Sequence, residues 1–468
     1  MIEVNNKKES NIINNKKKSG MTTTRQILLG FILAILIGTV LLSLPIATVN
    51  GETDLLTSLF TATTSVCVTG LVVVDTFSHW TIFGKIVILC LIQLGGLGIV
   101  AFTSAVMLMF NRKVTLKDRM MIQDAFSLNN LQGMVKFVKK VILGTLVVEL
   151  AGALCYLIVF IPKFGVAKGI WFAVFNAISA FCNAGIDIMG PDSLMSFNSS
   201  PIVLVTTMML ICMGGLGFVV WWDVLDVLKR IVKKELRIRD FWRNIRTHSK
   251  IVLSATVALI ISGTVLIFVF EYNNPDTIGN MTLGDKLLNS VFQSVTFRTA
   301  GFASINQSGL KDTSVLLGIV FMLIGGSPVG TAGGIKTVSF AVLVLAVKAV
   351  VKGRKETVVF NKSISENIVR RSLAVTFISI TVFFLFTILL IATNGLSLSD
   401  ASYEIASAIA TVGLTRSVTP TLNVFGRIII IIAMYLGRIG PISMFIAFSN
   451  KYSIKNSIHY AEADIIVG

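Results

Sequence analysis

The sequence predicts an all-α polytopic membrane protein with four pseudo-symmetric repeats around a central pore. Hydrophobic residues make up 54% of the 468 residues and charged residues 14%, with a mean hydropathy of +0.82, which is typical of a chain surrounded by lipid. A short apolar run that ends in a glycine turn occurs four times, and each copy lies between two longer apolar runs. Most basic residues fall on one side of the resulting arrangement.

The four glycine turns close at positions 70, 185, 301 and 413, about 115 residues apart. Close packing of two helices is the simplest explanation for any single glycine of this kind. Four copies at regular spacing instead indicate four walls around one hole. The residues that we assign to its lining are Val68, Thr69 and Gly70; Asn183, Ala184 and Gly185; Thr299, Ala300 and Gly301; and Thr411, Val412 and Gly413.

Each repeat contains an outer span, a short run and an inner span. The spans are long enough for the ~30 Å hydrocarbon core, whereas a short run covers about 20 Å or less and must be re-entrant. This predicts eight transmembrane helices and four re-entrant pore helices. We expect outer spans at 25–46, 136–161, 250–272 and 368–393, re-entrant runs at 54–66, 169–182, 284–297 and 399–410, and inner spans at 80–111, 201–230, 313–350 and 422–449.

These elements divide the chain into four pore repeats between two tails. The repeats cover residues 21–118, 119–240, 241–356 and 357–450. Residues 1–20 are rich in Asn, Lys and Ser, so this tail is expected to be disordered, and residues 451–468 form the C-terminal tail. With eight spans both termini share one side, and that side carries most of the 41 Lys and Arg. The positive-inside rule therefore places both tails in the cytoplasm.

The charge and cysteine content exclude other classes of protein. The net charge of +17 lies in short segments between the apolar runs, which argues against a nucleic-acid-binding protein. The five cysteines fall within or beside apolar runs and lack metal-binding spacing. An enzyme would need a nucleophile, a metal cluster or paired carboxylates in the spans, and Glu149 stands alone there. We expect neither enzymatic activity nor an organic cofactor.

Glycines recur downstream of each turn and should weaken all four inner spans at one depth, and the third inner span carries the largest number of them. Residues 325–336 contain five glycines and a proline where a helix should continue, so a loop is expected at membrane depth. A phosphate-binding loop is disfavoured because Ile335 separates the last glycine from Lys336. The residues assigned to this loop are Gly325, Gly326, Ser327, Gly330, Thr331, Gly333, Gly334 and Lys336.

The turns suit the coordination of an alkali cation. A dehydrated cation needs several oxygens around it, and backbone carbonyls supply them where an extended chain lines a pore. Glycine tolerates backbone angles there that other residues resist. We predict sites for an alkali cation at the carbonyls of Thr69, Ala184, Ala300 and Val412.

Several segments resemble the Trk/Ktr/HKT superfamily of potassium transporters, most closely the KtrB-type membrane subunits of bacterial Ktr systems. The resemblance covers about residues 21 to 468 and includes SVCVTGL at 65–71, FCNAG at 181–185, FRTAGF at 297–302, ATVGL at 410–414 and YAEADIIVG at 460–468. Only the fourth turn keeps the Thr-Val-Gly of a potassium-channel filter, and the other three turns depart from it. Some sodium-carrying plant relatives have serine at the first filter glycine, so Gly70 favours potassium.

The resemblance implies a potassium uptake subunit of the bacterial plasma membrane. It implies a selectivity filter at the four turns and a gate at the loop 325–336, with Arg438 as a contact of that gate. It also implies a homodimer in membrane lipid, regulated by a cytoplasmic nucleotide-binding RCK subunit of the KtrA or KtrC type. The alternative role for Arg438 is purely structural: its side chain would find its polar partners in the packing between helices.

Two other transport functions remain open. One is a sodium or mixed sodium/potassium transporter of the Trk/HKT type. The other is a secondary transporter for an organic solute, which would require two halves of opposite topology and is therefore disfavoured. Asp75, Asp187 and His79 are expected near the outer mouth, either attracting cations or as solvated loop residues, and Glu149 and Arg298 are expected to be buried against protein.

Overall fold

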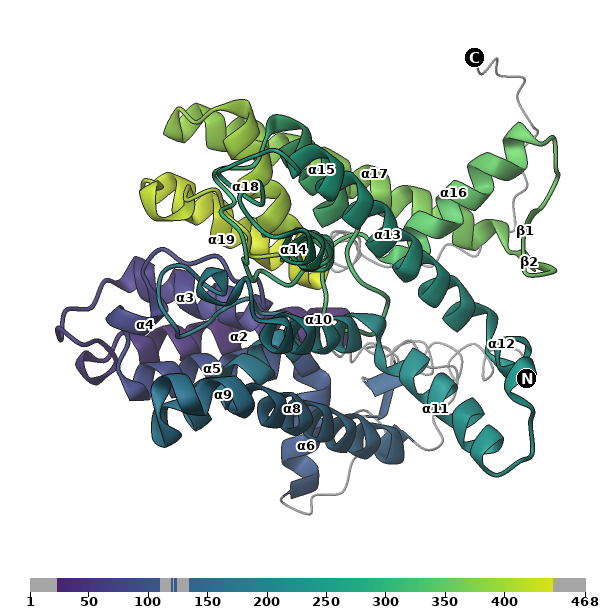
Figure 1. Ribbon diagram of the computed structural model, residues 1–468, viewed down its shortest axis with the longest axis horizontal. Coiled ribbons are helices and arrows are strands. Elements are labelled where there is room, and N and C mark those ends of the chain that lie inside the picture. Colours follow the sequence, from purple (N-terminus) through teal and green to yellow (C-terminus); the bar gives the residue numbers. More distant parts are fainter. Residues whose placement is uncertain (1–22, 110–118, 121, 124–133, 441–468) are drawn as a thin grey trace, which may run out of the picture.

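The computed structural model describes residues 23–109, 119–120, 122–123 and 134–440, and this part of the chain is mostly helical. The two predicted tails and the end of the fourth inner span lie outside these residues. The described strands form one short antiparallel hairpin, β1 (Thr357–Val359) and β2 (Lys362–Ile364). In Figure 1 the helices of the first half of the chain, up to α11, fill the lower part of the view, and those from α13 onward fill the upper part.

Four described helices are long and apolar enough to cross a membrane, and a fifth span results if the bent pair α10 and α11 is counted as one. Side chains such as Leu143, Leu146 and Leu150 on α8 are more than half exposed, which suits helices that contact lipid. These long helices are α2 (Thr23–Leu42), α8 (Met134–Phe164), α13 (Thr247–Glu271) and α17 (Glu366–Asn394).

A shorter helix follows each long one, packs against it and ends at a glycine turn. The start of three of them is fixed by a side-chain cap: Asp54, Thr282 and Ser397 accept hydrogen bonds from the first-turn N–H groups. The short helices are α3 (Leu55–Cys67), α9 (Val166–Cys182), α14 (Leu283–Thr296) and α18 (Leu398–Ala410).

Within the described residues, the helices after the first three turns are broken. The sequence predicts weak points in all four inner spans and a loop in the third, and the structure has breaks at Gly98 and Gly217 as well. Both glycines have a positive φ, 81° and 83°, which no helix allows. The segments are α5 (Ile82–Leu97) and α6 (Ile99–Met109), α10 (Pro201–Leu216) and α11 (Phe218–Val232), α15 (Asp312–Leu323) and α16 (Thr337–Val351), and α19 (Val424–Ile439).

Glycines of these inner helices give the short helices room to approach. A Cβ at Gly95, Gly214 or Gly437 would overlap the carbonyl of Val66, Phe181 or Ile409, which lie at the ends of α3, α9 and α18. A Cβ at Gly325 would overlap its own loop instead, at Gly333. The glycines of the inner helices therefore help to position the glycine turns at the ends of the short helices. Only a residue without Cβ lets the two backbones come this close.

A small-to-large change between α8 and α10 should destabilise the protein. A Cβ at Gly152 would lie 2.6 Å from Leu210 Cδ1, so Gly152→Ala should lower the free energy of unfolding by about 1–3 kcal/mol. Gly144 on the same helix has its nearest neighbour at 3.5 Å, and Gly144→Ala is the matched control. Unfolding in mixed detergent micelles measures both, and equal stability of the two variants would contradict this packing.

Candidate functional site

The four glycine turns meet in a closed ring. A Cβ at Gly70 would lie 2.5 Å from the carbonyl oxygen of Ala184, one at Gly185 would lie 2.6 Å from that of Ala300, and one at Gly301 would lie 2.6 Å from that of Val412. A Cβ at Gly413 would overlap the carbonyl of Thr69, which returns the ring to the first turn. Each glycine thus faces the carbonyl of the next turn, and a side chain at any of them would displace a neighbour.

The backbone repeats the same conformation in all four turns. The four glycines have φ values of 100°, 64°, 80° and 97°. The residue two positions earlier is also left-handed in every turn, although none of these residues is glycine. Such angles persist only where the surrounding structure enforces them. The left-handed residues are Val68 (φ 56°), Asn183 (φ 59°), Thr299 (φ 64°) and Thr411 (φ 52°).

Each turn is held by a buried hydroxyl on the preceding helix, a feature that the sequence analysis missed. Gly70 N–H donates to Thr64 Oγ1 and Gly413 N–H donates to Ser407 Oγ, both at 3.0 Å. In the other two turns the hydroxyl is the donor: Ser179 Oγ to the carbonyl of Ile186 at 2.5 Å, and Thr296 Oγ1 to that of Phe302 at 2.7 Å. A hydroxyl five or six residues before each glycine was the available signal.

These bonds leave the predicted ion-binding carbonyls free. The N–H groups of Thr69, Ala184 and Val412 each donate back to the short helix at 2.8 Å, and Ala300 N–H does so at 3.1 Å. Within the described residues, none of these four residues accepts a hydrogen bond at its carbonyl. Four unpaired carbonyl oxygens therefore lie around one ring, where they can coordinate a cation. The described side chains form no cluster of His, Cys, Asp or Glu that could hold a metal ion.

A buried amide and phenol network supports the third turn from behind. Gln307, beyond that turn, exchanges two hydrogen bonds with Gln293 on α14, at 2.8 and 3.0 Å. It also accepts from Tyr403 Oη at 3.0 Å and donates to the carbonyl of Ile305 at 2.9 Å. Since Tyr403 lies on α18, this network also joins the third turn to the fourth short helix.

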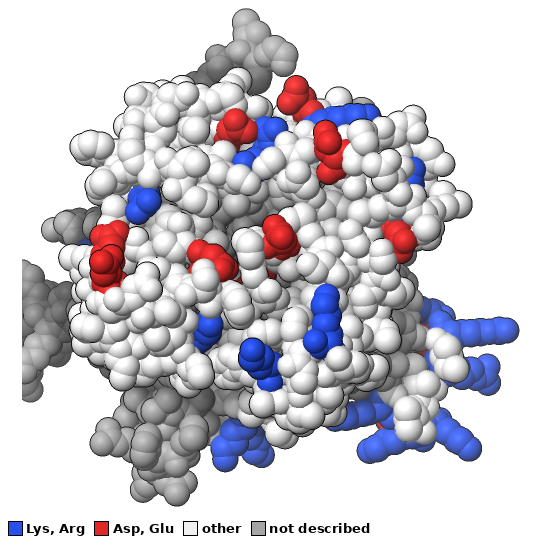
Figure 2. Space-filling view, turned by 60° about the vertical axis from the view of Figure 1, so that its left-hand side comes forward, with Lys and Arg blue, Asp and Glu red and all other residues white. Residues whose placement is uncertain are grey.

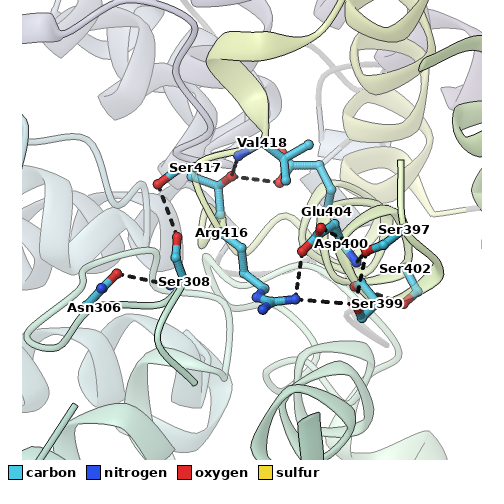
Figure 3. Close-up of polar contacts among 11 residues, drawn as sticks. Asn306, Ser308, Ser397, Ser399, Asp400, Ser402, Glu404, Arg416, Ser417 and Val418 are labelled. Carbon is cyan, nitrogen blue, oxygen red and sulfur yellow. Dashed lines mark hydrogen bonds and ion pairs between the residues drawn. The ribbon is translucent and has the colours of Figure 1, made fainter. Parts of the chain in front are cut away.

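A carboxylate replaces the amide behind the fourth turn. Glu404 on α18 is fully buried and accepts from Thr415 Oγ1 at 2.7 Å and from Thr419 Oγ1. In Figure 3 Arg416, in the same loop, points toward Asp400 near the start of α18, and the ion pair measures 2.6 Å. The loop after this turn is therefore fixed at two positions of α18, Asp400 near its start and Glu404 in its middle.

A cavity of about 330 Å³ opens on one side of the ring, and residues from all four turns line it. Figure 2 shows carboxylates and several basic side chains around the hollow of this face, and the largest group of basic side chains lies at the lower right edge. Asp75 and Asp187 line the cavity, and His79, which packs edge-on against Trp80, is not among the lining residues. Burial raises the pKa of Asp187 to about 6; the Asp75 charge also raises it, and a hydrogen bond from Met189 N–H lowers it.

The predicted loop within the third inner span docks on the break between α10 and α11. Its neck is closed by Gly325 N–H, which donates to the carbonyl of Ile335 at 2.9 Å. Ser327 N–H donates to the carbonyl of Gly215 at 2.9 Å, and Thr331 N–H to that of Gly214 at 3.1 Å. Helix residues that lost their partners at the break are thereby paired, as membrane depth requires.

Arg438 contacts this loop, and the other charged residues predicted at depth are buried against protein. Its guanidinium donates to the carbonyls of Thr331 and Gly95. Lys336 Nζ donates to Ala332 within the loop at 2.7 Å. Arg298 and Glu149 are only 7% and 5% exposed. Their nearest polar contacts are Thr256 on α13 at 3.4 Å and Gln93 on α5 at 3.3 Å.

Comparison with known proteins gives consistent results. The family model TrkH, described as a cation transport protein, matches residues 6–460. The chain is 37% identical to Ktr system potassium uptake protein B of Bacillus subtilis, over 96% of this chain and 97% of that protein. It is 35% identical to the potassium/sodium uptake protein NtpJ of Enterococcus hirae, over 96% and 98%. The solved potassium transporter TrkH of Vibrio parahaemolyticus has the same fold, with a TM-score of 0.70 at 16% identity over 92% of this chain and 86% of that one.

Removal of the Gln307 amide should be costly. Gln307→Leu leaves the Gln293 amide and the Tyr403 hydroxyl buried without a partner, and each such group costs about 1–3 kcal/mol. We expect a lower midpoint of thermal unfolding in detergent. Ser308→Ala, at the adjacent exposed position, should change the free energy of unfolding by about 0.5 kcal/mol or less. Similar midpoints for the two variants would show that the network does not support the turn.

Proposed function

Because this chain belongs to the TrkH family of cation transport proteins, we propose that it is the ion-translocating subunit of a Ktr-type potassium uptake system in the bacterial plasma membrane. Potassium ions pass from the cavity through the ring of glycine turns and on toward the cytoplasm. The ring of four unpaired carbonyls is the observation that carries this proposal.

The ring suits selection of a cation for two physical reasons. The carbonyls of Thr69, Ala184, Ala300 and Val412 replace the hydration shell of K⁺, so the filter uses backbone oxygens and needs no charged side chain. The helices α3, α9, α14 and α18 all end at the turns. Their C-terminal dipole ends therefore lie near the ring, where partial negative charge favours a cation.

The membrane arrangement follows from the same proposal. The four long helices and the broken inner helices form eight spans, and the four short helices are re-entrant, which makes four repeats of span, pore helix and span. The cavity faces outside and both termini are cytoplasmic. Basic side chains such as Lys229, Arg230 and Lys233, after the break in the second inner span, support this orientation.

The loop at residues 325–336 acts as the gate beneath the filter. The loop joins α15 to α16 without regular helical structure, at a position where a continuous helix would leave the pore open. Arg438 fixes the loop through the carbonyl of Thr331. The system functions as a homodimer whose gate is controlled by a cytoplasmic nucleotide-binding RCK subunit of the KtrA or KtrC type. The Bacillus subtilis relative is named as a protein of a Ktr system, and this name supports the presence of a partner subunit.

A mixed sodium/potassium transporter is the second candidate. The NtpJ relative, 35% identical, is named as a potassium/sodium uptake protein. The glycine at all four turns favours potassium over sodium, and ion competition in uptake assays distinguishes the two. An organic-solute transporter has no such support.

The filter assignment is tested at the first turn. Gly70→Ser places a Cβ against the Ala184 carbonyl and should lower the preference for K⁺ over Na⁺ on the order of tenfold. Gly51 also has a positive φ, 70°, but lies in open space, so Gly51→Ser controls for backbone strain alone. Competition of Na⁺ with K⁺ uptake into liposomes is the measurement. Unchanged ion preference in a normally folded Gly70→Ser protein would falsify the filter assignment.

Uptake at low K⁺ concentration should depend on external pH. Asp187, with its pKa raised to about 6, is mostly charged at pH 7 and mostly neutral at about pH 5, so acidification removes negative charge that attracts cations. We expect uptake to fall severalfold across this range. K⁺ uptake by Asp187→Asn should be slow and should not fall further on acidification. In Asp75→Asn the fall should occur at lower pH, because the negative charge that raises the pKa of Asp187 is removed. A fall that persists in Asp187→Asn would assign the effect to another group.

A further inference from the structure

We propose that the gate loop also holds the second filter turn, through a hydrogen bond between Thr331 and Asn183, so that ion selection weakens when the loop moves. This inference rests on the proposed function, because it requires the turns to be the filter and the loop to be the gate. It adds a direct physical link between the two. Thr331 thereby becomes a positioning residue for selectivity.

The contact lies at the end of α9. Thr331 Oγ1 is 3.1 Å from Asn183 Oδ1 and 3.3 Å from the carbonyl oxygen of Phe181. All three residues are buried. A Cβ at Gly214 would overlap the Phe181 carbonyl and would approach Thr331 Oγ1 and Asn183 Oδ1 to 2.7 and 2.8 Å. These four residues therefore converge at one point between the loop, the inner helix and the filter.

Asn183 has few other partners. Its Nδ2 is buried and makes no hydrogen bond within the described part of the chain, so the Thr331 hydroxyl is the hydrogen-bond donor available to its side chain. Asn183 also holds the left-handed angle of its turn, at φ 59°, directly before Ala184, whose carbonyl faces Gly70 in the ring. A buried amide that loses its partner must move toward another. Movement of Asn183 would shift the Ala184 carbonyl.

The backbone of Thr331 is held in place by two further contacts. Its N–H donates to the carbonyl of Gly214 at 3.1 Å, and its own carbonyl accepts from Arg438. One residue thus joins the loop to the broken inner helix, to the filter and to the last inner helix. Displacement of the loop from the pore would break the bond to Asn183 in the same motion.

The second turn differs from the others at this position. Val68, Thr299 and Thr411 occupy the equivalent left-handed position in the other turns. For Val68 the side chain has no polar atom, and Thr299 Oγ1 and Thr411 Oγ1 are buried without a hydrogen-bond partner. In the described residues, the hydrogen bond between a loop side chain and a turn side chain is therefore specific to the second turn, although Gly333 of the loop also lies close to the Thr411 side chain. Val68 also shows that a valine can adopt this backbone conformation.

The experiment compares five variants in liposomes that contain the purified full-length protein, one of which combines Thr331→Val with Asn183→Val. Thr331→Val removes the donor and keeps the shape, Thr331→Ser keeps the donor, and Asn183→Val removes the acceptor, as Val68 does in the first turn. Deletion of residues 326–334 removes the loop. K⁺ flux and the preference for K⁺ over Na⁺ are both measured, and the unfolding midpoint of each variant confirms that it is folded.

Thr331→Val and Asn183→Val should each lower the K⁺ preference by about two- to tenfold, the change expected from one hydrogen bond. Thr331→Ser should restore most of it. The double valine variant should lose no more than the stronger single variant, because both remove the same bond. If Thr331→Val does not fold, Asn183→Val alone still tests the link. Unchanged preference in the folded valine variants, or an equal loss in Thr331→Ser, would overturn the inference.

The deletion separates this inference from the gate itself. Faster flux together with reduced K⁺ preference supports both. Faster flux with the preference of the parent protein supports the gate and overturns its link to the filter. Flux no faster than that of the parent overturns the gate, and the inference with it, whereas the filter assignment is tested independently at Gly70.

Discussion

The close approach of four backbone segments is the constraint on which the structure depends. The glycines at 70, 185, 301 and 413 lie so near their neighbours that no side chain fits between them. Other features serve this approach. The left-handed residues before the glycines reverse the chain, the hydroxyls of the short helices hold it, and glycines of the inner helices admit the helix ends. The carbonyl oxygens can form a ring only because these residues allow the four backbone segments to lie close together.

Irregular backbone at membrane depth imposes a second constraint, because its polar groups need partners that lipid does not provide. The turns satisfy their N–H groups on the short helices, and the break at Gly217 is satisfied by the loop from the third inner span. The loop proposed as the gate is consequently also part of the helix packing. Its movement must exchange these hydrogen bonds for bonds to water or to another arrangement of the inner helices.

The side chains of the four turns differ although their backbone does not. The residue before each glycine is Thr69, Ala184, Ala300 or Val412, yet all four carbonyls occupy equivalent places in the ring. A site made of carbonyls tolerates such variation, since coordination requires the backbone conformation and not a given side chain. The side chains of the four turns can therefore differ and make separate contacts, such as that of Asn183 with Thr331. The amide network at Gln307 and the carboxylate at Glu404 support the third and fourth turns in two further ways.

The sequence by itself determined the class of the protein and the four turn glycines, because hydropathy and regular spacing are properties of the chain. It also indicated the loop at 325–336, where five glycines and a proline exclude a helix. Only the tertiary structure decided that Gln307 pairs with Gln293 and Tyr403, that Glu404 holds the fourth turn, and that Thr331 reaches Asn183. These pairs join residues up to 148 positions apart. A buried polar residue carries no mark of its partner in the sequence, since the partner is chosen by which backbones the glycines allow to meet.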